Sequence, residues 1–153
     1  MTVEAEVTIK GTTAAVWSAI TDIGHAAESI SGIEKIELIE QPKDGLVGLR
    51  WRETRIYFGK PATVEKHITE AVDNRFCTTQ AESDGFVFLS TMTLSESGSG
   101  VTLTSSHDTR PQGLVARLKS IPMPLFRGIL KKALLQDLTD IKTLVERRGS
   151  AAS

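Results

Sequence analysis

Between Ile33 and Pro111 the sequence contains no apolar pattern of helix length, and this absence constrains the fold more than any other feature. Turn-forming sequences such as Pro42-Lys43-Asp44-Gly45 and Asp73-Asn74 divide the stretch into short segments. Six strands are therefore predicted, at residues 33–41, 46–58, 62–72, 75–83, 86–96 and 100–110. Because the connections are too short for crossovers, successive strands are expected to be antiparallel neighbours.

The segments on either side complete a fold of the α+β class. Thr2 to Lys10 alternates apolar and polar residues, which predicts a seventh strand. Two short helical segments follow, at residues 12–21 and 22–30, and Asp22 is expected to cap the second. From Phe126 to Val145 apolar residues recur at helical spacing. We therefore predict a curved seven-stranded antiparallel sheet wrapped around a long C-terminal helix.

The C-terminal region carries two further signals. Pro122 and Pro124 cannot both lie inside a straight helix, so a helical segment over residues 112–121 is expected to end or kink there. The small residues of 149–153 suggest a disordered tail. A chain of 153 residues fits one domain, which we place at residues 1–148.

Composition excludes several classes of protein. The formal net charge of −1 gives the chain as a whole no reason to bind nucleic acid, and no apolar run is long enough for a membrane span. The single cysteine, Cys77, excludes an internal disulfide and is expected on the outer sheet face, and a cytoplasmic protein is the default expectation. His25, His67 and His107 fall in different elements, so we predict no metal and no cofactor.

Positive charge is concentrated near the C-terminus. From Gln112 to Arg148 there are eight Lys or Arg residues and three Asp or Glu residues. This excess favours a solvated helix face, because cations suit the C-terminal end of a helix. The less favoured interpretation is a surface for a protein partner or a membrane.

Hairpin geometry allows the inward face of the sheet to be estimated. The assumed registers place the following residues opposite one another: Trp51 and Ile68, Glu53 and Lys66, Ile68 and Gln80, Gln80 and Phe88, Phe88 and His107, Ser90 and Ser105, Met92 and Leu103. The resulting inward face is mostly apolar, yet it includes several polar side chains: Glu53, Lys66, Thr78, Gln80, Ser90, Ser105 and His107. A closed core rarely buries so many polar groups, which favours a pocket for a small molecule over a mutually satisfied core.

Three stretches resemble a known superfamily. Ala15–Asp22, Ile30–Ile33 and Val47–Arg55 are similar to the corresponding parts of START-like or Bet v 1-like proteins, in particular the bacterial polyketide cyclase/dehydrase and lipid-transport (SRPBCC) branch. The resemblance covers nearly the whole chain and implies a helix-grip fold. It also implies a cavity between sheet and C-terminal helix that takes a hydrophobic or amphipathic molecule. Members include carriers, aromatic polyketide cyclases and co-chaperones.

The candidate ligand-binding residues combine the inward face of the sheet with the apolar face of the helix. They are Trp51, Glu53, Ile68, Gln80, Phe88, Ser90, Met92, Leu103, Ser105, His107, Met123, Phe126, Leu130 and Leu134. The favoured function is binding or carrying a hydrophobic small molecule without chemistry. One alternative is a cyclase or dehydratase in which His107 and Glu53 serve as acid and base. A second alternative is a co-chaperone-like interaction module that binds a protein through the basic C-terminal helix.

Overall fold

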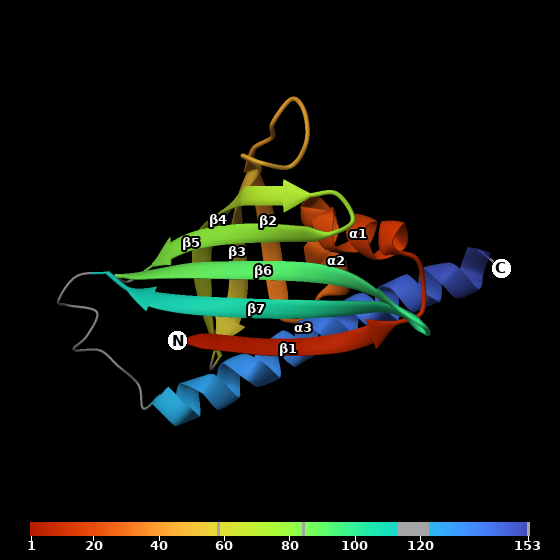
Figure 1. Cartoon of the computed structure of the whole chain (residues 1–153). Helices are drawn as coiled ribbons and strands as arrows, with labels where there is room; N and C mark the ends of the chain where they lie inside the picture. Colours follow the sequence, from red (N-terminus) through yellow and green to blue (C-terminus); the bar gives the residue numbers. More distant parts are fainter. Residues whose placement is uncertain (58, 84, 113–122, 153) are drawn as a thin grey trace.

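The computed structural model describes residues 1–57, 59–83, 85–112 and 123–152, and it has seven strands and one long helix (Figure 1). In chain order the elements are β1 (Thr2–Ile9), α1 (Thr13–Thr21), the 3-10 helix η1 (Ile23–His25), α2 (Ala26–Ser29), β2 (Ile33–Glu40), β3 (Arg50–Tyr57), β4 (Lys60–Val72), β5 (Phe76–Ser83), β6 (Phe86–Ser97), β7 (Gly100–Pro111) and α3 (Met123–Ala152).

All seven strands form one antiparallel sheet in the order β1-β7-β6-β5-β4-β3-β2. Tight hairpins join β3 to β7 in succession, while β1 pairs with β7 at the far edge. The sheet curves, and α3 runs diagonally across it (Figure 1). The predicted fold, a curved sheet around a long C-terminal helix with short helices after the first strand, is confirmed.

Two hairpin registers differ from the prediction by two residues. Trp51 lies opposite Lys66 rather than Ile68, and His107 lies opposite Ser90 rather than Phe88. The β3–β4 hairpin is centred one residue earlier in the sequence than assumed, and the β6–β7 hairpin one residue later. Moving the centre of a hairpin by one residue changes the partner of each strand residue by two. Because side chains alternate between the faces of a strand, a shift of two leaves every residue on the predicted face.

Strand β5 departs further from the prediction, because the residues expected on its inward face lie on its outward face and the reverse. A β-bulge lies between Ile68 and Glu70, so that Ile68 pairs with Thr79 and His67 pairs with Gln80. The inward positions of β5 are therefore Cys77, Thr79 and Ala81, and the predicted inward placement of Thr78 and Gln80 is wrong. The β5–β6 turn is one residue shorter than expected, which restores the inward orientation of Phe88, Ser90 and Met92 on β6.

The N-terminal helices were predicted in outline. Thr12 caps α1, with its hydroxyl oxygen accepting a hydrogen bond from the Ala15 backbone N–H at 3.1 Å. The second predicted helix is divided into η1 and α2. Asp22 does not cap the backbone there, because its carboxylate pairs with the His25 ring at 2.8 Å.

Helix α3 is buried only along its second half. Leu138, Ile141 and Val145 join a core cluster with residues of β1 and β7, whereas Leu125 and Ile129 are 59% and 42% exposed. The predicted stripe from Phe126 to Val145 is thus covered over only part of its length. The helix continues to Ala152, so residues 149–152 are helical where a disordered tail was expected.

Helix α3 begins at Met123, so Pro124 occupies its first turn, where proline is tolerated. The helical segment predicted before Pro122 lies outside the described residues. No helix within the described ranges has the length and apolar character needed to cross a membrane.

The buried half of α3 is expected to carry much of the stability of the fold. Leu138 has no exposed surface, so Leu138→Ala should lower the free energy of unfolding by about 2–5 kcal/mol. Leu135→Ala is the matched control on the same helix, because Leu135 is 39% exposed and should cost no more than about 0.5 kcal/mol. Urea denaturation of both variants measures the difference, and equal losses would contradict this packing.

Candidate functional site

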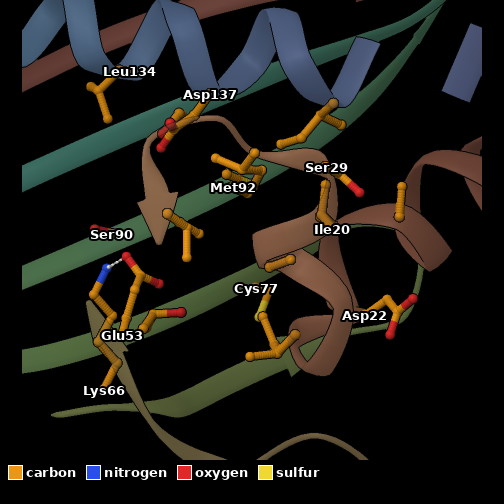
Figure 2. A pocket seen from close by; sticks show the side chains of 18 of the residues that line it. Ile20, Asp22, Ser29, Glu53, Lys66, Cys77, Ser90, Met92, Leu134 and Asp137 are labelled. Atoms are coloured by element: carbon orange, nitrogen blue, oxygen red, sulfur yellow. Dashed lines mark hydrogen bonds and ion pairs between the residues drawn. The ribbon is translucent and has the colours of Figure 1, made fainter. Parts of the chain in front are cut away.

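A pocket of about 200 Å³ lies between the inward face of the sheet, the α1–α2 segment and α3 (Figure 2). Its apolar lining includes Ile20, Ile23, Ile30, Ile33, Trp51, Met92, Leu130, Ala133, Leu134, Ile141 and Leu144. Its polar lining includes Glu53, Arg55, Lys66, Thr79, Ser90, Ser105, His107 and Asp137. The helical wall is therefore largely apolar, although it also carries Asp22, His25, Ser29 and Arg148. The floor on β3 to β7 holds most of the other polar groups, beside the apolar side chains of Trp51 and Met92.

Eight of the predicted ligand-binding residues line this pocket. They are Trp51, Glu53, Ser90, Met92, Ser105, His107, Leu130 and Leu134. The pocket lining omits Phe126 and Phe88, although the Phe88 ring lies 5.8 Å from the His107 ring. Ile68 and Leu103 are instead fully packed core residues. Gln80 lies on the other face of the sheet, and the side chain of Met123 lies outside the described part of the chain.

The pocket also contains residues that were predicted on the outer face of the sheet or were not predicted to lie near a ligand. Cys77 was expected on the outer face, but the bulge in β4 turns it and Thr79 inward. Burial raises the pKa of the Cys77 thiol to about 11, so it is protonated at neutral pH. The wall from α1 to α2 and the carboxylate of Asp137 were not predicted either. Asp137 has no local signal, because its partner Arg55 is 82 residues away.

Four charged side chains form a continuous chain across the pocket floor. Lys66 Nζ and Arg55 Nε each donate to Glu53 Oε2 at 2.8 Å, and Trp51 Nε1 donates to Oε1 at 3.4 Å. The guanidinium of Arg55 also holds both carboxylate oxygens of Asp137, at 3.2 and 2.8 Å. Figure 2 shows Glu53 and Lys66 joined on the sheet, with Asp137 facing them from α3. Glu53 and Lys66 were expected directly opposite one another, but Glu53 lies opposite Val64 and Lys66 opposite Trp51. As diagonal neighbours they still form an ion pair, within a larger network.

This network keeps Glu53 ionised. Burial alone would raise the pKa of Glu53, but the positive charges and hydrogen bonds of Lys66 and Arg55 outweigh it and lower the pKa to about 2. Burial opposes the charged form of Arg55 as well, and its hydrogen bonds to Asp137 nevertheless raise the pKa of the guanidinium. A carboxylate with three donors and so low a pKa is a weak base at neutral pH. The structure therefore argues against Glu53 as the partner of His107 in acid–base chemistry.

His107 differs from Glu53, because its side chain is uncharged at neutral pH and hydrogen-bonds through Nδ1. Its Nδ1 lies 2.9 Å from the Ser90 hydroxyl, and its ring packs against Phe88. Burial lowers the pKa of His107 to about 4, and the positive charge of Lys66 adds to this effect. A neutral imidazole can donate or accept one hydrogen bond at Nε2, depending on its tautomer. His107 is therefore suited to contact a polar group of a ligand.

Among the described residues, no three His, Cys, Asp or Glu side chains are grouped so that they could hold a metal ion.

Comparison with known proteins agrees with the observed architecture. The family model described as polyketide cyclase / dehydrase and lipid transport matches residues 1–146. The crystal structure of the Zhui aromatase/cyclase from Streptomyces sp. R1128 superposes with a TM-score of 0.79 at 20% identity, covering 100% of this chain and 98% of that one. No curated protein matches significantly by sequence.

Two further solved structures are similar in the same way. A START superfamily protein from Mycobacterium smegmatis gives a TM-score of 0.80 at 14% identity, with 95% and 97% of the two chains covered. The di-domain aromatase/cyclase StfQ of the steffimycin biosynthetic pathway gives 0.80 at 12% identity, and the match covers 97% of this chain and 51% of that one. Likeness at these identities establishes the fold alone.

The lowered pKa of His107 predicts a specific loss of stability in acid. The unfolded chain protonates this imidazole near pH 6.5 and the folded protein only near pH 4, so acidification across this window favours unfolding. We expect His107 to account for a loss on the order of 2 kcal/mol between these pH values. Urea denaturation as a function of pH should give a flatter profile for His107→Gln. An unchanged slope in the variant would contradict a buried neutral imidazole.

Proposed function

Because the chain belongs to the polyketide cyclase / dehydrase and lipid transport family, we propose that its pocket binds and carries an amphipathic small molecule. The observation that carries this proposal is the division of the pocket into two parts. Ile20, Ile30 and Leu134 belong to the mostly apolar helical wall, whereas Lys66 and His107 belong to the polar floor. An apolar cavity with a few convergent polar groups is the usual form of a small-molecule site.

The size of the pocket restricts the ligand. An engineered apolar cavity of about 150 Å³ binds benzene, so a volume of about 200 Å³ suits a molecule with one or two rings. A longer lipid requires outward movement of the first half of α3, where no described side chain from Leu125 to Asp137 is fully buried. Lipid binding therefore belongs to this proposal as a second ligand class, one that depends on movement of the helix.

The polar floor favours a ligand that carries hydrogen-bond acceptors. The ammonium group of Lys66 has three N–H donors and gives one to Glu53. Ser105 supplies a further donor, and the hydrogen-bonded pair of Ser90 and His107 supplies one more, because their mutual bond uses one of their two protons. The two cations of the ion chain are balanced by the two carboxylates of Glu53 and Asp137. An anion thus gains little net attraction, and we propose that the ligand presents a neutral or weakly acidic carbonyl or phenol oxygen.

This proposal predicts a preference between two probes of equal shape. Acetonaphthone should bind more tightly than ethylnaphthalene of the same substitution pattern, because only the ketone can accept a hydrogen bond from the pocket floor. Each of Ser90→Ala and His107→Leu should reduce this preference by about fivefold, the value of one hydrogen bond of about 1 kcal/mol. Isothermal titration calorimetry measures both affinities.

Ser106→Ala is the matched control, since Ser106 lies on the opposite face of β7 from His107. It should leave both affinities unchanged. The carrier function would be refuted if neither probe bound the parent protein and native mass spectrometry showed the purified protein to be empty.

A cyclase or dehydratase is the second candidate, and the neutral imidazole of His107 in the pocket is the observation that favours it. In such an enzyme His107 takes the proton from a carbon next to a carbonyl group of the substrate. His107→Gln should then lower turnover of a model poly-β-ketone by about 10²–10⁴-fold. Acetonaphthone affinity should change only a few-fold. A loss of affinity with no turnover in the parent protein would assign His107 to binding alone.

The location of the protein and its binding of protein partners are also matters of proposal. We propose a cytoplasmic location, because the one cysteine of the chain is a half-buried thiol with no partner for a disulfide within the chain. The co-chaperone alternative rests only on the basic C-terminal helix, and the pocket gives it no support.

A further inference from the structure

The first half of α3 presents apolar and cationic side chains to solvent together. Leu125, Ile129 and Leu135 are 59%, 42% and 39% exposed. Two exposed cations, Lys132 on the same side of the helix and Lys131 beside it, form with these apolar residues what we call the α3 surface. Its members are Leu125, Ile129, Lys131, Lys132 and Leu135, while the exposed Arg127 lies on the flank nearer Leu134. Isolated exposed apolar residues are ordinary on a protein surface, but three within three turns of one helix form a cluster.

The charge of this surface has one sign. No acidic residue occurs between Met123 and Gln136, although the chain as a whole has a net charge of −1. The first carboxylate along α3 is that of Asp137, and it is bound by the guanidinium of Arg55. The α3 surface therefore carries two positive charges, with Arg127 on its flank, that no acid on the same helix half offsets, and an anionic partner complements it.

The same half of the helix borders the pocket. Leu130, Ala133 and Leu134, which lie between the members of the α3 surface in sequence, line the pocket. Tyr57, at the end of β3, also lines it and is 51% exposed, so the pocket reaches solvent there. In Figure 1 the first half of α3, in light blue, extends past the edge of the sheet. A body docked on the α3 surface would thus lie beside an opening of the pocket.

We propose that the α3 surface docks on the anionic surface of a lipid bilayer. Helices that lie in a membrane interface combine Lys and Arg with Leu and other large apolar residues, as this one does. The centre of a protein–protein interface is instead depleted in lysine, whereas Lys131 and Lys132 lie in the middle of the α3 surface. The benefit of docking rests on the proposed function, because an apolar ligand could then pass between pocket and bilayer without crossing water.

Sedimentation with lipid vesicles tests this directly. The protein should bind vesicles that contain phosphatidylglycerol and phosphatidylcholine, and should not bind vesicles of phosphatidylcholine alone. Added salt should weaken binding, because it screens exposed charges. Lys131→Glu combined with Lys132→Glu should reduce binding at least tenfold, since each basic residue near an anionic surface contributes about fivefold. Leu125→Ser combined with Ile129→Ser should reduce it at both low and high salt.

The matched control carries the same change of charge elsewhere. Lys10 and Lys43 are both exposed, and they follow β1 and β2 at sites well separated from the first half of α3 in Figure 1. Lys10→Glu combined with Lys43→Glu should retain at least half of the vesicle binding. Circular dichroism should show the same fold in all variants, because every substituted residue is exposed.

Three outcomes would overturn the proposal. The first is equal binding to both kinds of vesicle. The second is a loss of vesicle binding in the variant with Lys10→Glu and Lys43→Glu that equals the loss in the variant with Lys131→Glu and Lys132→Glu. The third is self-association of the parent protein that the α3 substitutions abolish. The last result would assign the surface to contact between two copies of the chain. Acetonaphthone affinity in solution separates this proposal from the preceding one. The affinity for acetonaphthone should be unaltered in the variant that combines Lys131→Glu and Lys132→Glu. If the parent protein does not bind acetonaphthone, the ligand function is refuted, while the vesicle result still stands on its own.

Discussion

The chain of alternating charges formed by Lys66, Glu53, Arg55 and Asp137 ties the middle of the sheet to the helix that covers it. Each of these charges would be costly to bury alone, and Glu53 is only 7% exposed. Arg55 occupies the centre of the chain and bonds one carboxylate on its own strand and one on α3. Gly32 leaves room for it, because a Cβ there would lie 2.9 Å from Arg55 Nη1. The network therefore fixes the distance between helix and sheet beside the pocket, while apolar packing around Leu138 fixes the far end of α3.

The arrangement of strands could be predicted because it depends on signals that are local in the sequence. Alternation identifies strands, turn residues separate them, and short turns require antiparallel pairing. The inward face of β3 survived because its register error with β4 amounted to two residues. The face of β6 survived because the bulge and the shorter β5–β6 turn, each a difference of one residue, cancel in their effect on orientation, and β7 differs from β6 by a further two. The bulge at Thr69 had no such signal: neither glycine nor proline marks it. One unpaired residue was enough to exchange Gln80 for Thr79 and to turn Cys77 into the pocket.

Other parts of the site could not be predicted because they depend on contacts between distant segments. Periodicity identified the apolar face of α3 but not how much of it the sheet would cover. With 30 residues the helix is about 45 Å long, and the buried positions Leu138 and Val145 lie in its second half. The residues nearer its start keep an apolar face with fewer partners, and the pocket lies along the middle of the helix, where residues from Leu130 to Arg148 line it. The ion chain from Lys66 to Asp137 joins the sheet to the helix within this lining, a contact between segments that no local pattern could reveal.

The same electrostatics bear on whether the pocket binds or catalyses. Groups that transfer protons in enzymes usually have pKa values near the working pH. Here the pKa of Glu53 is lowered to about 2 and that of His107 to about 4, and the positive charge of Lys66 contributes to both shifts. At neutral pH both groups are therefore in their basic forms, and Glu53 is already occupied by three donors. A cyclisation or dehydration must remove one proton and deliver another, so His107 would have to serve in both steps. A carrier requires only one hydrogen bond at Nε2 of the same imidazole, donated or accepted according to its tautomer.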